Sequence, residues 1–257
     1  MLLTIDVGNT QTVVGVFDGD RLIDHWRIGT DARRTADELA LTLQGFLSLR
    51  GTDMDTEITG VSIASVVPAL THTLREMTGR YFRQPAVIVE PGVRTGVPIL
   101  TDNPKEVGAD RIVNALAAYH LYGGPAIVVD FGTSTNFDVI SERGEFIGGA
   151  LAPGVEISID ALAARGAQLR KVEIARPRSV IGKNTVECLQ SGILYGFAGQ
   201  IDGILERMIA ELGQPAKVIA TGGLAPLIIS ECAFVDVHEP WLTLVGLRLV
   251  YEKNTTD

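Results

Sequence analysis

The sequence has few of the features that mark secreted or membrane proteins. It contains two cysteines, Cys188 and Cys232. Two thiols make no disulfide framework, and their spacing fits no zinc motif. We therefore expect buried thiols in a reducing cytoplasm. The start, MLLTIDVGNT, has no basic segment before its apolar residues, so no signal peptide is predicted. No run of 18 or more apolar residues occurs, so no membrane span is predicted either.

The sequence is also poor in histidine and in positive charge. Its four histidines are scattered without an HxxxH pair, which gives no metal-binding pattern. With 22 basic and 31 acidic residues, the net charge is -9, and this balance argues against nucleic acid or an anionic membrane as the main partner. Apolar residues make up 46% of the 257 positions, so one large domain or two small ones can bury a core.

A repeat is present with an offset of 124 residues. LTIDVGNTQTVVGVFDGDRLI aligns with IVVDFGTSTNFDVISERGEFI, so that Asp6 falls on Asp130 and Gly8 on Gly132. The same offset puts Thr10 on Ser134, Val16 on Ile140 and Leu22 on Phe146. Each copy predicts a strand, a tight Asp-x-Gly turn, a second strand, another turn and a third strand. Two similar domains follow, over residues 1–117 and 118–257.

The repeat explains the Asp130-Phe131-Gly132 triplet, which resembles the DFG of protein kinases. A protein kinase also needs a glycine-rich loop, a VAIK lysine and an HRD loop, and the sequence has none of them. A P-loop and a GxGxxG dinucleotide motif are also missing. The triplet is therefore interpreted as the second copy of Asp6-Val7-Gly8.

Helical and strand patterns alternate through both halves. Such alternation predicts an α/β fold with mixed sheets covered by helices. The predicted helices are 36–49, 69–80, 110–122, 185–212 and 241–252, with Thr35 as a cap of the first. The strands predicted outside the repeat are 61–66, 86–89 and 218–220.

The Asp-x-Gly loops suit a phosphate-binding role. A carboxylate at the end of a buried strand needs a partner or a cation, and the glycine lets a phosphate approach the backbone. Two such loops would clamp a polyphosphate with a metal held by the aspartates. A third loop, Thr221-Gly222-Gly223, follows a strand and suits the adenine ribose. Ordinary hairpins and a structural Gly-Gly turn are the alternatives.

The segment Gly108-Ala109-Asp110-Arg111 begins a predicted helix. Asp110 suits a helix start for local reasons alone. An acid beside an arginine also suits phosphoryl transfer. The arginine would hold an anionic substrate, and the aspartate would take the proton of the attacking hydroxyl.

Together these motifs resemble the type III pantothenate kinases. DxGNT, GADR, DxGT and the strand-GG loop occur in the family's order, with NPKEVGADRIVNALAAY, GGALAPGVEIS and RPRSVIGKNTVECLQSG around them. The resemblance covers nearly the whole chain. It implies two duplicated ribonuclease-H-like domains of the acetate and sugar kinase, Hsp70 and actin superfamily. It also implies ATP-dependent phosphorylation of pantothenate, the first step of coenzyme A synthesis.

The resemblance assigns roles to particular residues. Asp110 is the implied general base, with Gly108, Ala109, Asp110, Arg111 and Thr185 as substrate contacts. Asp130 is the implied site for potassium or ammonium, and Asp6 lies near the magnesium that accompanies ATP. The implied ATP contacts are Asp6, Val7, Gly8, Asn9, Thr10, Gln11, Thr12, Val13, Gly132, Thr133, Gly222 and Gly223.

The resemblance further implies a homodimer with the substrate site near its interface. Gly192, Gly196, Gly199 and Gly203 would keep one helix face thin for such contact, although packing within one chain explains them equally well. Two departures occur: Val97 stands where many relatives have an aromatic residue, and the second loop reads Thr133-Ser134-Thr135-Asn136. A nucleotide-binding regulator on the same fold and a kinase for another hydroxyl, such as a sugar, remain alternatives.

Overall fold

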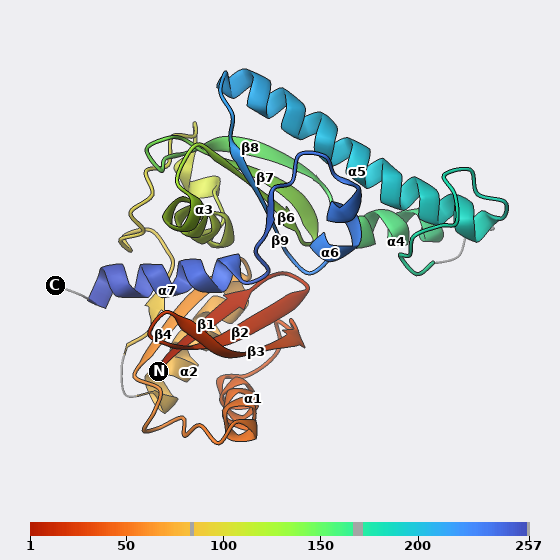
Figure 1. The fold of residues 1–257 in the computed structure, drawn as a ribbon. Helices are drawn as coiled ribbons and strands as arrows, with labels where there is room; N and C mark the ends of the chain where they lie inside the picture. Colours follow the sequence, from red (N-terminus) through yellow and green to blue (C-terminus); the bar gives the residue numbers. More distant parts are fainter. Residues whose placement is uncertain (83–84, 167–171, 256–257) are drawn as a thin grey trace. The chain divides into compact units, whose positions relative to one another are not determined.

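A computed structural model describes residues 1–82, 85–166 and 172–255, which form two compact units (Figure 1). The first unit contains residues 1–117 and 242–257, and the second contains residues 118–241. The C-terminal helix thus belongs to the first unit, whereas the sequence predicts it in the second domain.

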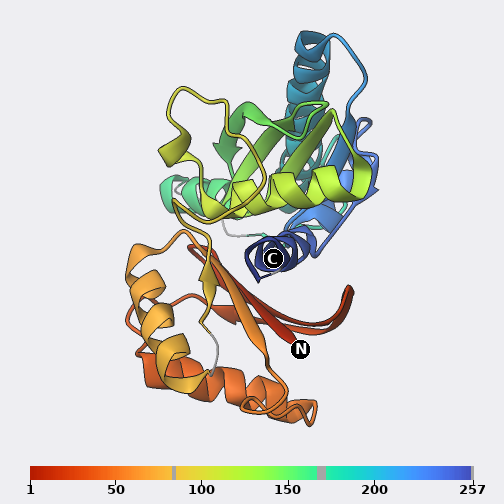
Figure 2. The same cartoon turned by 90° about the vertical axis from the view of Figure 1, so that its left-hand side faces the viewer.

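The first unit is a mixed five-stranded sheet with helices on both faces. Its strand order is β3-β2-β1-β4-β5, in which β1, β2 and β3 are antiparallel and β4 and β5 run parallel to β1. Figure 2 shows α1 and α2 on one face of this sheet and α7 on the other. The elements are β1 Leu2–Val7, β2 Gln11–Asp18, β3 Arg21–Gly29, α1 Ala36–Leu49, β4 Gly60–Ser65, α2 Pro68–Tyr81, β5 Val87–Ile88, the 3-10 turn η1 Pro104–Glu106, the start of α3 Ala109–Tyr122, and α7 Leu242–Thr255.

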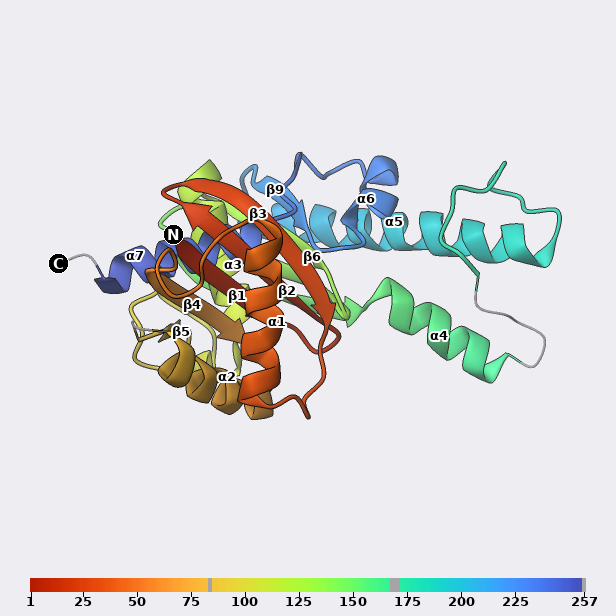
Figure 3. The same ribbon diagram turned by 90° about the horizontal axis from the view of Figure 1, so that it is seen from below.

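The second unit repeats this topology. Its strand order is β10-β9-β6-β7-β8, with the same pattern of antiparallel and parallel pairs. Figure 3 shows α4 and the first turns of α5 projecting beyond this sheet. The elements are β6 Ala126–Phe131, β7 Ser134–Ile140, β8 Phe146–Pro153, α4 Val155–Arg165, α5 Thr185–Leu212, β9 Lys217–Thr221, α6 Ala225–Ile228, the 3-10 turn η2 Ile229–Glu231, and β10 Val237–His238. Two mixed sheets of identical order confirm the predicted duplicated α/β fold.

The repeat holds in the structure with one local correction. Asp6 pairs with Val13 across the first hairpin, whereas Asp130 pairs with Asn136, so the turn of the second hairpin is one residue shorter. Position 16 therefore corresponds to 139 rather than 140, and both copies have a β-bulge there. The next turn restores the predicted offset of Leu22 to Phe146. The two hairpins thus pair their strands in the same way although their turns differ in length. This is expected because the buried face of each strand fixes its register.

Alternation along β1 explains how the first unit is built. Leu3, Ile5 and Val7 are buried in the core against α1 and α2. Thr4 and Asp6 point to the opposite face, where α7 packs on β1 and β4. A Cβ on Gly15 of β2 would lie 2.8 Å from Leu244 Cδ1, so a residue without a side chain lets α7 approach the sheet closely. The buried face of α7 is the physical reason for its place in the first unit.

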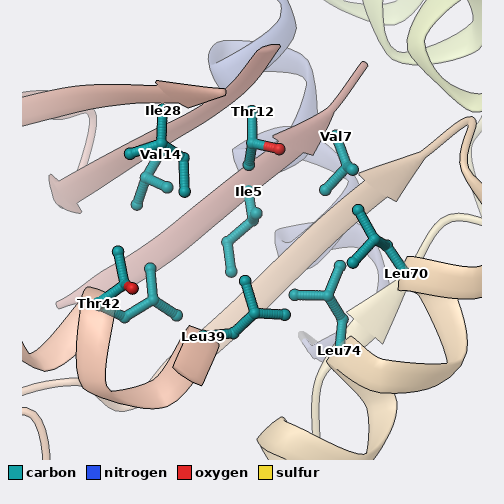
Figure 4. A pocket seen from close by; sticks show the side chains of 10 residues that line it. Ile5, Val7, Thr12, Val14, Ile28, Leu39, Thr42, Leu70 and Leu74 are labelled. Carbon is teal, nitrogen blue, oxygen red and sulfur yellow. The ribbon is translucent and has the colours of Figure 1, made fainter. Parts of the chain in front are cut away.

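A small apolar cavity lies between the first sheet and helices α1 and α2 (Figure 4). It has room for about one water molecule but offers it almost no polar partner, so we expect it to stay dry. Such a void is a packing defect rather than a ligand site. Its lining consists of Ile5, Val7, Thr12, Val14, Ile28, Leu39, Thr42, Leu43, Leu70 and Leu74.

Candidate active site

The Asp6 loop lies at the carboxyl end of β1. The N–H of Gly8 donates to Gln11 O at 3.0 Å and closes the hairpin. Asn9, Thr10 and Gln11 are exposed at its tip. Open α/β sheets bind ligands outside the carboxyl ends of their strands, so the exposed donors of the loop are well placed for phosphate oxygens.

Not every residue of this loop can offer its side chain. Val7 and Thr12 are buried and line the cavity under the loop (Figure 4). Thr12 Oγ1 lies 2.9 Å from Thr30 Oγ1. These two residues can therefore reach a nucleotide only through their backbone groups. Val13 is the cross-strand partner of Asp6 and shares its face of the sheet.

The Asp130 loop repeats this arrangement in the second unit. The N–H of Gly132 donates to Ser134 O at 3.0 Å, and both Gly132 and Thr133 are exposed. A Cβ on Gly132 would lie 3.9 Å from Asp130 Oδ1. The carboxylate therefore stands directly under the turn, where a cation or phosphate would be held.

The Gly-Gly loop meets Asp130 from the neighbouring strand β9. Gly222 has φ +92°. A Cβ there would lie 2.6 Å from Asp130 Oδ1 and 2.6 Å from both N and O of Phe131. Gly222 is thus required by close backbone contact with β6, while Gly223 is exposed. The structure brings Asp130, Gly132 and Gly222 together at one end of the second sheet.

Gly154 is a part of this loop cluster that the sequence analysis missed. It is the N-cap of α4, and its N–H donates to Thr133 O at 3.1 Å. A Cβ on Gly154 would collide with the carbonyl oxygens of Gly132 and Thr133. The Pro153-Gly154 pair before a helical pattern was the available signal.

Asp110 lies in the first turn of α3. Its Oδ1 accepts the N–H of Arg111 at 2.9 Å, and the N–H of Ile112 donates to Gly108 O at 3.2 Å. Burial raises the pKa of the Asp110 carboxyl above its ordinary value, although the Arg111 N–H and the charge of Arg111 act to lower it. A carboxylate with a raised pKa is a better proton acceptor.

Within the first unit, the Asp110 motif lies close to the Asp6 loop. The N–H of Val66, which follows β4, donates to Val7 O at 3.0 Å. A Cβ on Gly108 would come within 3.6 Å of Val66 Cγ1 and would collide with the Asp110 carboxylate. Val66 therefore links the two motifs at the carboxyl ends of β1 and β4, so the unit places a candidate base beside a candidate phosphate loop.

Thr185 lies elsewhere in the second unit. It is the first residue of α5, is exposed, and follows the N-cap Asn184, whose side chain accepts the N–H of Glu187. This end of α5 projects beyond the sheet that carries Asp130 (Figure 3). The structure does not bring Thr185 next to the Asp130 loop.

The candidate cation sites rest on single carboxylates. Over residues 1–82, 85–166 and 172–255, no group of three or more His, Cys, Asp and Glu residues could hold a metal. Magnesium binds through one or two carboxylates together with substrate phosphates, so Asp6 and Asp130 at strand ends fit ions that arrive with a nucleotide. Cys188 and Cys232 are both free, and Cys188 is exposed, contrary to the expectation that both are buried. None of the helices that the structure describes is long and apolar enough to span a bilayer.

Comparison with known proteins identifies the family. The family model for type III pantothenate kinase matches residues 2–207. A type III pantothenate kinase from Frankia alni is 68% identical over 255 residues, which are 99% of this chain and 100% of that protein.

Two solved structures show the same fold at low identity. A conserved putative Baf family transcriptional activator from Campylobacter jejuni has a TM-score of 0.60 and 17% identity over 98% of both chains. A ROK family glucokinase from Streptomyces griseus, in complex with glucose and AMPPNP, has a TM-score of 0.53 and 12% identity over 99% of this chain and 100% of that one. The fold is thus the duplicated ribonuclease-H-like fold of actin-like ATPases and sugar kinases, and the chain belongs to the type III pantothenate kinase family.

Proposed function

We propose that this chain transfers the γ-phosphoryl group of ATP to the 4'-hydroxyl of pantothenate, the first step of coenzyme A synthesis. The observation that carries the proposal is the position of Asp110 beside the Asp6–Gly8 loop at one end of the first sheet. A protein that only binds nucleotides has no use for a carboxylate of raised pKa at that place. The family membership supports the same substrate.

The proposed chemistry divides between Asp110 and Arg111. The Asp110 carboxylate accepts the proton of the 4'-hydroxyl of pantothenate. At the same time the oxygen of that hydroxyl forms a bond to the γ-phosphorus of ATP. The bond from that phosphorus to the β,γ-bridging oxygen breaks, and ADP leaves with the electron pair. Arg111 binds the carboxylate of pantothenate and so holds the hydroxyl in line.

The proposed nucleotide contacts come from all three glycine loops. The exposed backbone around Gly8 and Gly132 would cradle phosphates, and Gly223 would face the adenosine. Asp6 would hold magnesium with the ATP phosphates, and Asp130 would hold potassium or ammonium. These ions would supply positive charge that offsets the negative charge of the phosphates, and the loops would fix the orientation of the phosphates. Free cysteines support a reducing cytoplasm as the proposed location.

The identity of the phosphoryl acceptor distinguishes a pantothenate kinase from the two alternatives, a sugar kinase and a nucleotide-binding regulator. ADP formation would be measured with pantothenate, with panthenol, which has an alcohol in place of the carboxylate, and with glucose, in potassium or sodium. We expect turnover that depends on pantothenate and on potassium. Turnover with glucose alone would favour a sugar kinase, and ATP binding without turnover on any acceptor would favour a regulator.

Replacing Arg111 tests the role of the substrate carboxylate. For Arg111→Gln we expect the KM for pantothenate to rise about 10- to 100-fold, since a hydrogen bond to a charged group contributes about 1.5–3 kcal/mol. The KM for panthenol should change little, because panthenol has no carboxylate to lose a partner. Steady-state kinetics on both acceptors provide the comparison. Equal losses on the two would remove Arg111 from carboxylate binding.

The glycine stripe of α5 supports a homodimer as part of the proposal. Gly192, Gly196 and Gly199 are exposed, and a Cβ at any of them would meet no atom within 4 Å among the described residues. Packing among the described residues therefore gives no reason for these three glycines. A helix of a second copy could approach this thin face closely.

Gly196→Leu tests the proposed dimer. In a monomer, replacing a mid-helix glycine stabilises the helix by up to about 1 kcal/mol. In a dimer packed on this face, the added side chain should shift the protein to monomers. Sedimentation velocity would follow the mass, with Glu206→Ala, an exposed change on the same helix, as the control. A Gly196→Leu protein that remains dimeric would show that this face is not the interface.

A further inference from the structure

The connection between β5 and α3 is unusually long. It comprises residues 89–108, and η1 is its only helical turn. Loops of this length without regular structure are uncommon in compact domains and are often functional. We call residues 89–108 the strap. Its last residue, Gly108, leads directly to Asp110 and Arg111.

The end of α7 holds the first half of the strap. Asn254 Oδ1 accepts the N–H of Arg94 at 3.1 Å, and Asn254 Nδ2 donates to Arg94 O at 2.9 Å. One side-chain amide thus satisfies both backbone groups of Arg94, as a neighbouring strand would. Asn254 Nδ2 also donates to Val250 O at 2.7 Å, which fixes the side chain on its own helix.

The adjacent residue of α7 extends this contact. Gly96 has φ +74°, and a Cβ there would lie 3.0 Å from both Cε and Nζ of Lys253. The lysine side chain therefore packs across the strap, where the glycine leaves it room. Val97, the next residue, is buried with 7% of its surface exposed. Together Lys253 and Asn254 hold residues 94–97 against α7.

Beyond this contact the strap is largely solvated before it reaches the candidate site. Residues 102–106 are all exposed. Gly108 is then fixed by the first hydrogen bond of α3, from Ile112 N–H. The α7 contact at 94–97, the isolated β-bridge at Ile99 and the start of α3 thus anchor the part of the strap that leads to Gly108. Loss of one anchor should increase the motion of the backbone around Gly108.

We propose that Asn254 is a positioning residue for the acceptor site, acting through the backbone of Arg94. The inference rests on the proposed function, because it assigns the acceptor to residues 108–111. Each of the two hydrogen bonds to Arg94 contributes about 0.5–1.5 kcal/mol. Loss of these bonds should weaken the affinity for pantothenate, because the strap must be ordered before residues 108–111 can contact pantothenate.

The test compares Asn254→Ala with the wild-type protein. We expect the KM and the calorimetric Kd of pantothenate to rise about 5- to 150-fold, the range set by the loss of both bonds. The KM for ATP and kcat should stay within about twofold. Trypsin should cut at Arg94 faster, because the strap opens more often. Asn254→Asp, which keeps the acceptor for Arg94 N–H and loses the donor, should give an intermediate rise.

Thr255→Ala is the matched control, since it removes a hydrogen bond to Tyr251 O on the same turn of α7 without touching the strap. It should leave the constants for both substrates and the cleavage rate unchanged. Faster cleavage with an unchanged Kd for pantothenate would overturn the proposal, as would equal losses for ATP and pantothenate. Wild-type protein that binds pantothenate without turnover would refute the proposed function only, and the Kd values would still decide the role of Asn254. Wild-type protein that does not bind pantothenate would overturn both.

Discussion

Asp110→Asn should lower kcat about 10²- to 10⁴-fold, the range that a general base contributes. The variant keeps the shape of the side chain and an oxygen that can accept the Arg111 N–H, so substrate binding should change much less than turnover. Rapid-quench measurement of ADP formation at saturating ATP and pantothenate gives kcat directly. Asp55→Asn, an exposed carboxyl in a remote turn, serves as the control and should retain wild-type turnover.

The stability of the same variant separates catalysis from folding. Burial raises the pKa of Asp110 in the folded state, so the protonated form is favoured by folding. That contribution is present below the unfolded pKa and is lost as the pH rises through the folded pKa. Above the folded pKa the ionised carboxylate therefore destabilises the fold, and the neutral amide should melt no lower than wild type. A lower Tm with unchanged kcat would contradict the assigned role.

Among the proposed variants, Gly222→Ala should lower the free energy of unfolding the most. A non-glycine residue in the left-handed region costs about 1–2 kcal/mol, and overpacking a filled site adds about 1–3 kcal/mol. The added methyl would press on Asp130 and on the backbone of Phe131, so cation dependence should also change. Urea unfolding and activity against potassium concentration measure the two effects.

Gly213→Ala is the matched control for this variant. Gly213 ends α5 with φ +66°, and a Cβ there meets nothing within 4 Å. It therefore reports the conformational cost alone, without the contact with β6. Equal destabilisation in the two variants would show that the approach of Gly222 to Asp130 is unimportant.

Local signals explain which elements could be predicted from the sequence. The bounds of α1 and α5 agree with the predicted ranges, because Thr35 forms a capping box with Glu38 and Asn184 caps the longer helix. The strand bounds agree to within about two residues, as expected where apolar runs fix the interior of a strand and turns fix its ends. Hydrophobic pattern and caps therefore sufficed for the main elements.

Features that depend on tertiary packing were missed. α4, α6 and β10 were not predicted; α6 and β10 are too short for a periodic signal. The single-residue difference between the hairpins was also missed, because a constant offset cannot describe turns of unequal length. The return of α7 to the first unit depends on its contacts with β1 and β4, which no local pattern encodes.

The candidate site shows the same division. The sequence indicated strand ends for Asp6 and Asp130 and a helix start for Asp110, and the structure has them there. Three features could be found only from atomic positions. They are the burial that raises the pKa of Asp110, the contact of Gly222 with Asp130 and the hydrogen bonds of Asn254 to Arg94.

Identification of the product tests the proposed kinase activity most directly. Purified protein would be mixed with ATP, magnesium, potassium and pantothenate, and the products followed by phosphorus NMR. We expect one 4'-phosphopantothenate for each ADP formed. ADP without a phosphorylated acceptor, or bound ATP that remains intact, would contradict it.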